Sequence, residues 1–223
     1  MSTEVTPKRT RRQARFSKKR ALIVRSAAQA FGRKGFHATT LDEIAADLNV
    51  TKASLYYYFA TKEDLLYEVH LLSMQEVTEV LEKIRERGGP PPDQLRNALR
   101  EHLRIMATHY EGAFLLQQEY DLAPSRRGEI RRLRDNYETL FRNILEEGEQ
   151  QRFFRVKDVR VATRAILGSI NWLLRWYRSG GRLTVDEIAE AYCDLFFYGL
   201  LAPYAPSRQI ETDIEEKAES SAG

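Results

Sequence analysis

Apolar positions recur every three or four residues along most of the chain, which is the spacing of one face of an α-helix. The first stripe, Ile23, Ala27, Ala30 and Phe31, predicts a helix over about 17–33. Comparable patterns predict helices over about 40–48, 51–59, 61–87, 95–110, 130–144, 159–178 and 185–201. Alternating β-branched runs and Asn-Gly hairpins are nearly absent, so the chain is predicted to be all-α.

The segment 159–178 differs from the other predicted helices because its apolar side chains point in all directions. They include Ile166, Ile170, Trp172 and Trp176. A helix that is apolar all round must be covered all round. The segment is therefore either a core helix within one chain or a surface that a partner covers.

Two short predicted helices lie within residues 39–64. Ala45 in the first is small enough to let the second cross closely, and Leu55 in the second faces inward. Asn49 lies in the break, where the turn needs a left-handed residue, a conformation that Asn tolerates. The outer face of the second helix is polar, basic and aromatic, and it consists of Lys52, Ala53, Ser54, Tyr56 and Tyr57. This geometry is that of a helix-turn-helix, whose second helix enters a DNA major groove about 12 Å wide.

Charge is distributed unevenly along the chain. Residues 1–64 hold 13 basic and 6 acidic residues, whereas the remainder holds 22 basic and 26 acidic residues, which gives the net charge of +3. A basic N-terminal part on a slightly acidic body indicates a polyanionic partner, either nucleic acid or an anionic membrane surface. Peripheral membrane binding is the weaker alternative because no apolar face lies beside these charges.

Composition and motifs exclude several other classes. Of the 223 residues 43% are hydrophobic, which is enough for a sizeable core. One cysteine, Cys193, excludes a disulfide framework, and His102 and His109 are too far apart to bind one metal without ligands from elsewhere. No phosphate-binding or hydrolase motif, membrane span or signal-peptide core occurs. We therefore expect a cytoplasmic protein that is not an enzyme and has no cofactor and no metal.

Five short motifs occur at fixed spacings, namely Thr39-Thr40, Ile44-Ala45, Asn49-Val50, Tyr56 through Phe59 and Lys62-Glu63-Asp64-Leu65. With these motifs, residues 18–66 resemble the DNA-binding head of the TetR family of bacterial transcriptional regulators. Two positions depart from the family pattern. Asn49 replaces the usual turn glycine, and Ala53 replaces a glycine early in the second helix, so that a methyl group faces the groove.

The resemblance implies a fold and a division into domains. The fold is an all-α chain with an N-terminal three-helix helix-turn-helix head and a C-terminal helical ligand-binding and dimerisation domain. We predict a disordered basic arm over 1–16, the DNA-binding domain over 17–64, the ligand-binding and dimerisation domain over 65–205, and a disordered acidic tail over 206–223.

The resemblance also implies a double-stranded DNA operator as partner. Lys52 would reach a guanine edge, Thr40 would hold a phosphate at a helix N-terminus, and Lys62 would bind the DNA backbone. The threonines at helix starts act as caps in either case. The full set of expected DNA contacts is Lys18, Lys19, Thr39, Thr40, Thr51, Lys52, Ala53, Ser54, Tyr56, Tyr57, Tyr58 and Lys62.

A homodimer through about 159–178 and 185–201 is implied as well, because two recognition helices must reach successive major grooves. The middle helices would enclose a pocket for a small-molecule effector, apolar with a few polar groups. The expected lining residues are Met106, Tyr110, Phe114, Gln118, Tyr120, Tyr137, Phe141, Asn171, Trp172, Arg175 and Trp176.

Five arginines over 126–134 are suited to hold the phosphates of coenzyme A. The body resembles regulators of fatty-acid or sterol catabolism that respond to acyl-CoA. We therefore expect a transcriptional repressor in the cytoplasm, associated with the nucleoid, that an apolar or amphipathic effector such as a fatty acyl-CoA releases from a palindromic operator. A regulator of multidrug efflux that responds to aromatic or cationic compounds is the alternative.

Overall fold

The computed structural model describes residues 11–109 and 119–201, and within these two ranges every regular element is a helix. The all-α prediction is therefore confirmed. The elements are α1 (Arg11–Lys34), α2 (Leu41–Asp47), α3 (Lys52–Tyr56), α4 (Lys62–Arg87), α5 (Pro91–His109), the 3-10 helix η1 (Glu119–Asp121), α7 (Pro124–Gln150), α8 (Val159–Trp176) and α9 (Val185–Leu201).

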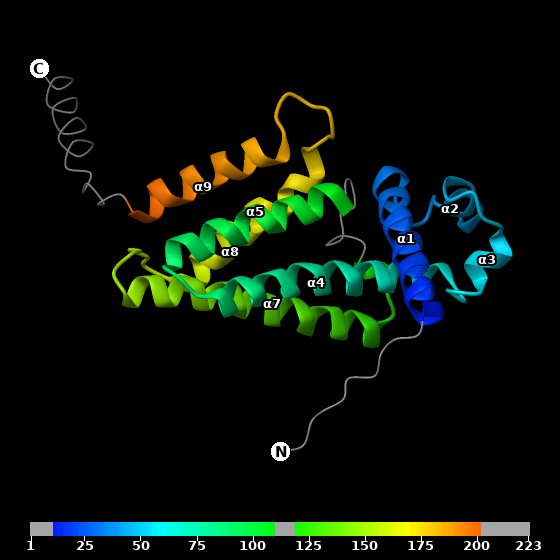
Figure 1. Cartoon of the computed structure of the whole chain (residues 1–223), viewed down its shortest axis with the longest axis horizontal. Helices are drawn as coiled ribbons and strands as arrows, with labels where there is room; N and C mark the ends of the chain where they lie inside the picture. The colour runs from blue at the N-terminus through cyan, green and yellow to red at the C-terminus, as the bar shows by residue number, and fades with distance from the viewer. Residues whose placement is uncertain (1–10, 110–118, 202–223) are drawn as a thin grey trace, which may run out of the picture.

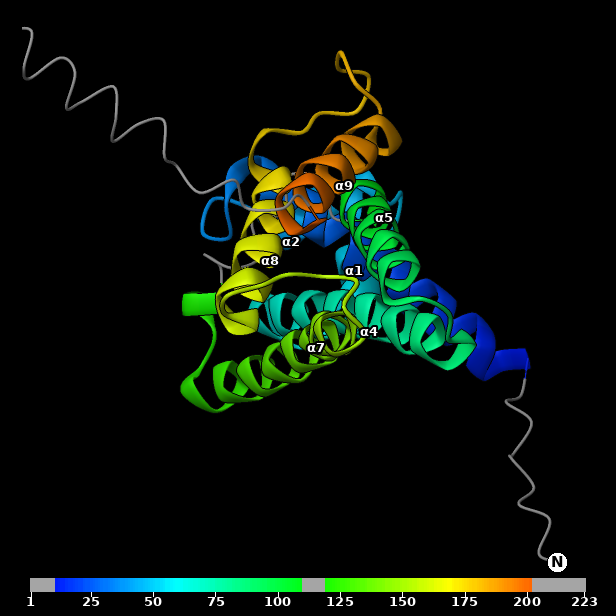
Figure 2. The same cartoon turned by 90° about the vertical axis from the view of Figure 1, so that its left-hand side faces the viewer.

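The helices form a small head and a larger body that share α4. Helices α1, α2 and α3 lie at one end of the molecule, and α4 runs from them into the body (Figure 1). In the body α4 packs against α5 and α7, while α5 also packs against α8 and α9. Figure 2 shows the body end-on, with α4, α5, α7 and α8 around a common centre. A change in the body can therefore reach the head through one continuous helix.

Local signals in the sequence set the ends of the head helices. The hydroxyls of Thr40, Thr51 and Thr61 each accept a backbone N–H three residues on, as the capping prediction requires. Caps of this kind contribute about 1 kcal/mol each. Asn49 has φ 51°, which confirms the predicted left-handed turn, and Gly88 ends α4 with φ 66°.

Several helix boundaries differ from the sequence prediction. Helix α1 begins at Arg11, so residues 11–16 of the expected arm are helical, and the ring of Phe16 packs against Tyr58 of the head. Helix α3 ends at Tyr56 and the chain turns at 57–59. Helix α7 extends well beyond the predicted 130–144. Residues 1–10 and the expected acidic tail over 206–223 lie outside the described residues.

Helix α8 is apolar on two sides, and only one of them is buried in the chain. Ile166, Ile170 and Leu173 are buried in the core. On the other side Val161 and Trp172 are 63% and 55% exposed. None of the described helices is both long enough and apolar enough to cross a membrane.

Candidate nucleic-acid interface and ligand cavity

Helix α3 presents the face that the sequence predicted. Leu55 is buried, whereas Lys52, Ala53 and Tyr56 are exposed and Tyr57 is 69% exposed. The helix lies at the far end of the head, away from the body (Figure 1). Thr40, Thr51, Lys18 and Lys19 are also exposed, and Ser54 is partly exposed. The short helix therefore offers an accessible polar, basic and aromatic surface of the kind that reads a major groove.

Lys52 is held in place by a carboxylate of the neighbouring helix. Its Nζ lies 2.7 Å from Asp42 Oδ2 of α2. This hydrogen bond raises the pKa of Lys52, so the ammonium is fully charged at neutral pH. Both side chains are exposed, so the pair contributes little to folding stability and is open to exchange for another anion.

An aromatic cluster fixes the end of α3 against α1. The ring of Phe16 lies 4.8 Å from that of Tyr58 and 6.0 Å from that of Tyr57, centroid to centroid. Tyr58 is half-buried in this contact. No local signal indicated the cluster, because Phe16 lies in the segment expected to be a disordered arm. The first turns of α1 thus orient two of the tyrosines expected at the interface.

Two of the residues expected to contact DNA are instead hydrogen-bonded within the head, which corrects the expectation for both. Thr39 is buried, and its hydroxyl lies 2.8 Å from the carbonyl oxygen of Gly35. Lys62 Nζ donates to the carbonyl oxygens of Phe36, His37 and Thr39 at 2.8, 3.2 and 2.9 Å. These contacts use all three donors of the ammonium. Lys62 therefore fastens the α1–α2 connection to α4.

Replacing Lys62 by Met is expected to lower the free energy of unfolding by about 2 kcal/mol, because three carbonyls lose a charged donor. Met keeps the apolar stem and removes the charge. Urea unfolding followed by circular dichroism measures the loss. Lys52→Met is the matched control, and we expect it to leave stability within about 0.5 kcal/mol of the wild type. Equal stability of the Lys62 variant and the wild type would contradict this structural role.

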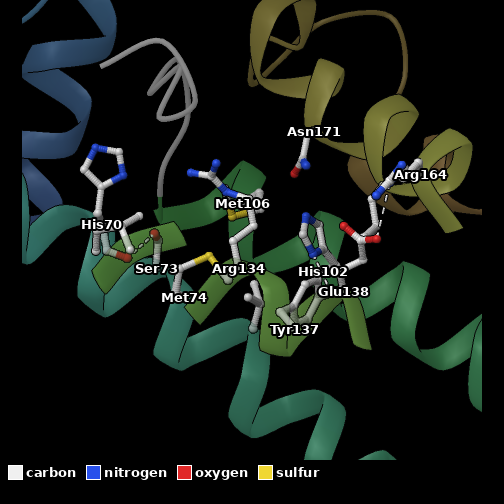
Figure 3. Close-up of a pocket in the computed structure, with 13 residues that line it drawn as sticks. His70, Ser73, Met74, His102, Met106, Arg134, Tyr137, Glu138, Arg164 and Asn171 are labelled. Atoms are coloured by element: carbon white, nitrogen blue, oxygen red, sulfur yellow. Dashed lines mark hydrogen bonds and ion pairs between the residues drawn. The ribbon is translucent and has the colours of Figure 1, made fainter. Parts of the chain in front are cut away.

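A cavity of about 220 Å³ lies in the body, between α4, α5, α7 and α8. Aliphatic and sulfur-containing side chains line it together with polar and charged ones (Figure 3). The lining residues are His70, Ser73, Met74, Val77, His102, Met106, Ile130, Arg134, Tyr137, Glu138, Arg164, Leu167 and Asn171. A concave space that combines apolar surface with placed polar groups is typical of a small-molecule site.

The cavity contains three of the residues expected to line it, Met106, Tyr137 and Asn171. Phe141 is buried behind Tyr137 and does not line this cavity. Four other expected residues lie at the surface, because the outer side of α8 and the turn at η1 face away from the cavity. They are Tyr120, Trp172, Arg175 and Trp176. Tyr110, Phe114 and Gln118 lie outside the described residues.

Two histidines of the cavity were not among the residues expected from the sequence. His70 lies in the apolar stripe of α4, and His102 lies in that of α5. A polar residue within a buried stripe is the signal that could have identified them. The sequence analysis considers His102 only with His109, as two residues too far apart to bind one metal without ligands from elsewhere.

Both imidazoles are buried and neutral. Burial lowers the pKa of His102 to about 4 and that of His70 to about 4, and the nearby Arg134 guanidinium adds to the effect on His70. His102 Nδ1 lies 2.8 Å from Tyr137 Oη. Asn171 lies near the ring, but Nε2 of His102 and Nε2 of His70 have no partner within hydrogen-bond geometry.

The charged residues at the cavity are paired with one another. Arg134 donates to Glu119 Oε2 at 2.5 Å, and Arg164 Nε lies 3.5 Å from Glu138 Oε1. The five arginines of the 126–134 segment are thus partly engaged within the chain. Arg126 forms ion pairs with Glu63 and Asp64 of α4.

Helix α4 connects the cavity to the head through side-chain bonds. Glu76 is bonded to Arg25 of α1 and accepts from His109 Nδ1 of α5 at 2.8 Å. Glu63, at the start of α4, accepts the backbone N–H of Ala123 at 3.0 Å. Ser73, Met74 and Val77 of the same helix line the cavity. The helix that bounds the cavity therefore also carries the contacts that hold the head.

Comparisons with known proteins agree with this architecture. Residues 88–200 match the family described as Tetracyclin repressor-like, C-terminal domain, and residues 23–69 match the bacterial regulatory proteins of the tetR family. The HTH-type transcriptional repressor KstR2 of Rhodococcus jostii (strain RHA1) is 26% identical over 191 residues, which cover 84% of this chain and 94% of that protein.

Two solved structures share both fold and sequence with this chain. The TetR family transcriptional regulator PfmR from Thermus thermophilus is 37% identical with a TM-score of 0.71, over 78% of this chain and 96% of that one. AibR in complex with isovaleryl coenzyme A and operator DNA is 26% identical with a TM-score of 0.68, over 83% of this chain and all of that one (100%). KstR2 and PfmR are transcriptional regulators rather than enzymes. With its helix-turn-helix head and its helical body both matched, the chain belongs to the TetR family of bacterial transcriptional regulators.

Proposed function

We propose that this protein is a homodimeric repressor that binds a palindromic operator and leaves it when an amphipathic effector, of the fatty acyl-CoA class, enters the cavity. The observation that carries the proposal is the double role of α4, which lines the cavity and fastens the head. A ligand that displaces this helix changes the spacing of the two heads. The shift is limited by the difference in the ligand's affinity for the two states.

The proposed DNA interface is the outer face of α3 with the N-terminus of α2 and the basic start of α1. It comprises Lys18, Lys19, Thr40, Thr51, Lys52, Ala53, Ser54, Tyr56 and Tyr57, with Tyr58 as a partly buried support. Lys52 is the proposed base contact, and it exchanges Asp42 for a guanine edge on binding.

Replacing Lys52 by Ala is expected to weaken operator binding by ~1–3 kcal/mol and to relax sequence preference at one position. Fluorescence anisotropy on the operator and on single-base variants, at several salt concentrations, measures both effects. Lys83→Ala is the matched control, because Lys83 is an exposed lysine of α4 remote from α3. This variant should bind the operator as tightly as the wild type does. Unchanged base selection by the Lys52 variant would contradict the assignment.

The proposed dimer surface is the apolar face of α8 and α9, which consists of Val161, Trp172, Trp176 and Leu195. Each of these side chains is at least 45% exposed in the single chain. Exposed apolar patches of this kind mark association surfaces. The sequence left segment 159–178 as either a core helix or a surface that a partner covers. In the proposed dimer both apply, because one side of α8 is core and a second copy covers the other.

An acyl-CoA effector is supported by the chemistry of the body. The cavity holds an apolar group, while the exposed arginines of α7, Arg131 and Arg132, offer guanidinium groups to phosphates outside it. AibR, similar over most of its length, is described with isovaleryl coenzyme A and operator DNA together. The lining contains one phenol ring, that of Tyr137, and its acidic residue Glu138 is paired with Arg164. The cavity therefore offers an aromatic cation few groups to bind.

The test is a titration of the protein–operator complex with acyl-CoA thioesters of increasing chain length, with free coenzyme A as the control. Operator DNA is obtained by selection from a random pool. We expect release at micromolar thioester and none with coenzyme A. If no chain length releases the DNA while a cationic dye does, the efflux-regulator alternative replaces this proposal.

A further inference from the structure

The carboxylate that holds Lys52 lies at the proposed DNA interface itself. Asp42 is in the first turn of α2, and its side chain is 61% exposed. Helices α2 and α3 pack against each other at the far end of the head (Figure 1). Lys52 Nζ and Asp42 Oδ2 are 2.7 Å apart. The carboxylate of Asp42 is therefore close to any base edge that the ammonium of Lys52 reaches.

Asp42 differs from the other two acidic residues of α2 in the helix that supplies its partner. Glu43 is paired with Lys34 of α1. Asp47 is paired with Arg33, which also belongs to α1. Asp42 is paired with the one charged residue in the sequence of α3. The recognition helix therefore brings its single positive charge to DNA together with a carboxylate.

An ammonium beside a carboxylate matches the major-groove edge of a G·C base pair. This edge presents the acceptors N7 and O6 of guanine next to the N4 amino donor of cytosine. Guanine O6 and cytosine N4 are bonded to each other in the base pair, so they are one hydrogen-bond length apart. Lys52 Nζ and Asp42 Oδ2 have the same kind of separation. The ammonium can therefore donate to guanine while the carboxylate accepts from cytosine.

The other base pairs match this arrangement less well. C·G and A·T place an amino donor against the ammonium and an acceptor against the carboxylate. T·A has its acceptor and donor in the right order, thymine O4 and adenine N6, but offers the ammonium a methyl group in place of guanine N7. It also places the acceptor N7 of adenine on the side of the carboxylate. The arrangement thus favours G·C in one orientation.

The phosphate backbone cannot satisfy both members of the pair, because phosphate oxygens only accept. While the pair is closed its two charges cancel, so Lys52 adds no net attraction to DNA of unrelated sequence. A phosphate that took the ammonium would leave the carboxylate of Asp42 unpaired beside a polyanion. A base pair with the right order of acceptor and donor instead supplies a partner for each side chain.

We infer that Asp42 is a specificity-determining residue of the DNA interface, and that Lys52 and Asp42 together read one G·C base pair, Lys52 on guanine and Asp42 on cytosine N4. On binding, each side chain exchanges its partner in the pair for a base. The inference rests on the proposed function for the placement of α3 in the major groove. It adds a base-reading side chain from α2, which the sequence analysis did not include among the DNA contacts.

The experiment uses the full-length protein and an operator obtained by selection from a random pool. Fluorescence anisotropy measures affinity for the operator, for its variants at each single base pair, and for DNA of unrelated sequence at several salt concentrations. The proteins are the wild type, Lys52→Ala, Asp42→Ala and the double variant. Asp47→Ala is the matched control, because it also removes an exposed, paired carboxylate from α2, but one whose partner lies in α1. Circular dichroism should show the same helix content in all five proteins.

We expect Asp42→Ala and Lys52→Ala to relax the same base pair, a G·C pair of the operator. Each should lower the penalty for replacing that pair by ~10-fold, within the range of one base contact. Asp42→Ala should also bind unrelated DNA more tightly, with a salt dependence steeper by about one phosphate contact, because the ammonium is free. The double variant should bind unrelated DNA as the wild type does, since the pair carries no net charge. Asp47→Ala should leave every base preference unchanged.

The inference and the proposed function fail separately. If Asp42→Ala keeps the preference that Lys52→Ala relaxes, relaxes a different base pair, or shares with Lys52→Ala a pair other than G·C, the inference is overturned. The wild type then still selects an operator that Lys52 contacts, so the proposed function stands. If the wild type selects no sequence, or if Lys52→Ala relaxes no position, the proposed interface is wrong and the inference is overturned with it.

Discussion

Glutamates introduced together at Val161 and Leu195 are expected to convert the proposed dimer to a monomer and to weaken operator binding by ~10³-fold, within the range that linked binding of two sites contributes. Both side chains are highly exposed in the single chain, at 63% and 65%, so the substitutions leave the core intact. In the dimer, however, each glutamate would lose its hydration inside an apolar interface.

Light scattering after size exclusion measures the mass, and fluorescence anisotropy measures the operator affinity. Gln151→Glu is the control, because Gln151 is exposed at the end of α7, away from the apolar face of α8 and α9. Circular dichroism should show the same helix content in all three proteins. A double variant that remains dimeric would place the interface elsewhere.

Acidification from pH 7 to pH 5 is expected to lower the free energy of unfolding by about 2 kcal/mol for each of His70 and His102. Each pKa falls from 6.5 to about 4 on folding because burial penalises the charged ring. Between these values the unfolded state binds more protons than the folded state, so stability rises with pH. The contribution is complete above pH 6.5 and is lost as the pH falls toward 4.

The measurement stops at pH 5 so that carboxylates do not contribute. A carboxylate whose pKa is lowered on folding, such as that of Glu76, affects stability only near and below its unfolded pKa of 4.5. Urea unfolding at fixed pH values measures the slope. His102→Gln should remove about half of the combined loss, since one titrating group is gone, whatever its effect on stability at pH 7. His37→Gln is the control, because His37 is an exposed histidine at the surface of the head. A slope that His102→Gln leaves unchanged would show that this ring is not the group that titrates.

Regular local signals made most of the fold predictable. Helical spacing of apolar residues, three threonine caps, the left-handed Asn49 and the Gly88 stop depend on neighbours within a few residues, so they can be read from sequence. The exposed face of α3 follows from the same periodicity. The start of α1 could not be predicted in this way because Phe16 is stabilised by Tyr58, 42 positions away in the sequence.

The site was less predictable because its polar side chains bond to partners that lie far away in the sequence. Lys62 matched a family motif, yet its ammonium is taken by three carbonyls of the α1–α2 connection. Trp172 and Trp176 matched the composition of a pocket, but the rotation of α8 turns them outward. His70 and His102 were not predicted since neither has a neighbour in sequence that marks it as a cavity residue.

The sequence by itself therefore determined the all-α class, the helix-turn-helix with its basic outer face, and the apolar excess of residues 159–178. These depend on periodicity, capping and charge, which are local properties. Only the tertiary structure decided which lysine is accessible, which side of α8 is core, and which polar atoms meet in the cavity. Those outcomes depend on how α4, α5, α7 and α8 pack, because packing brings into contact residues that lie far apart along the chain.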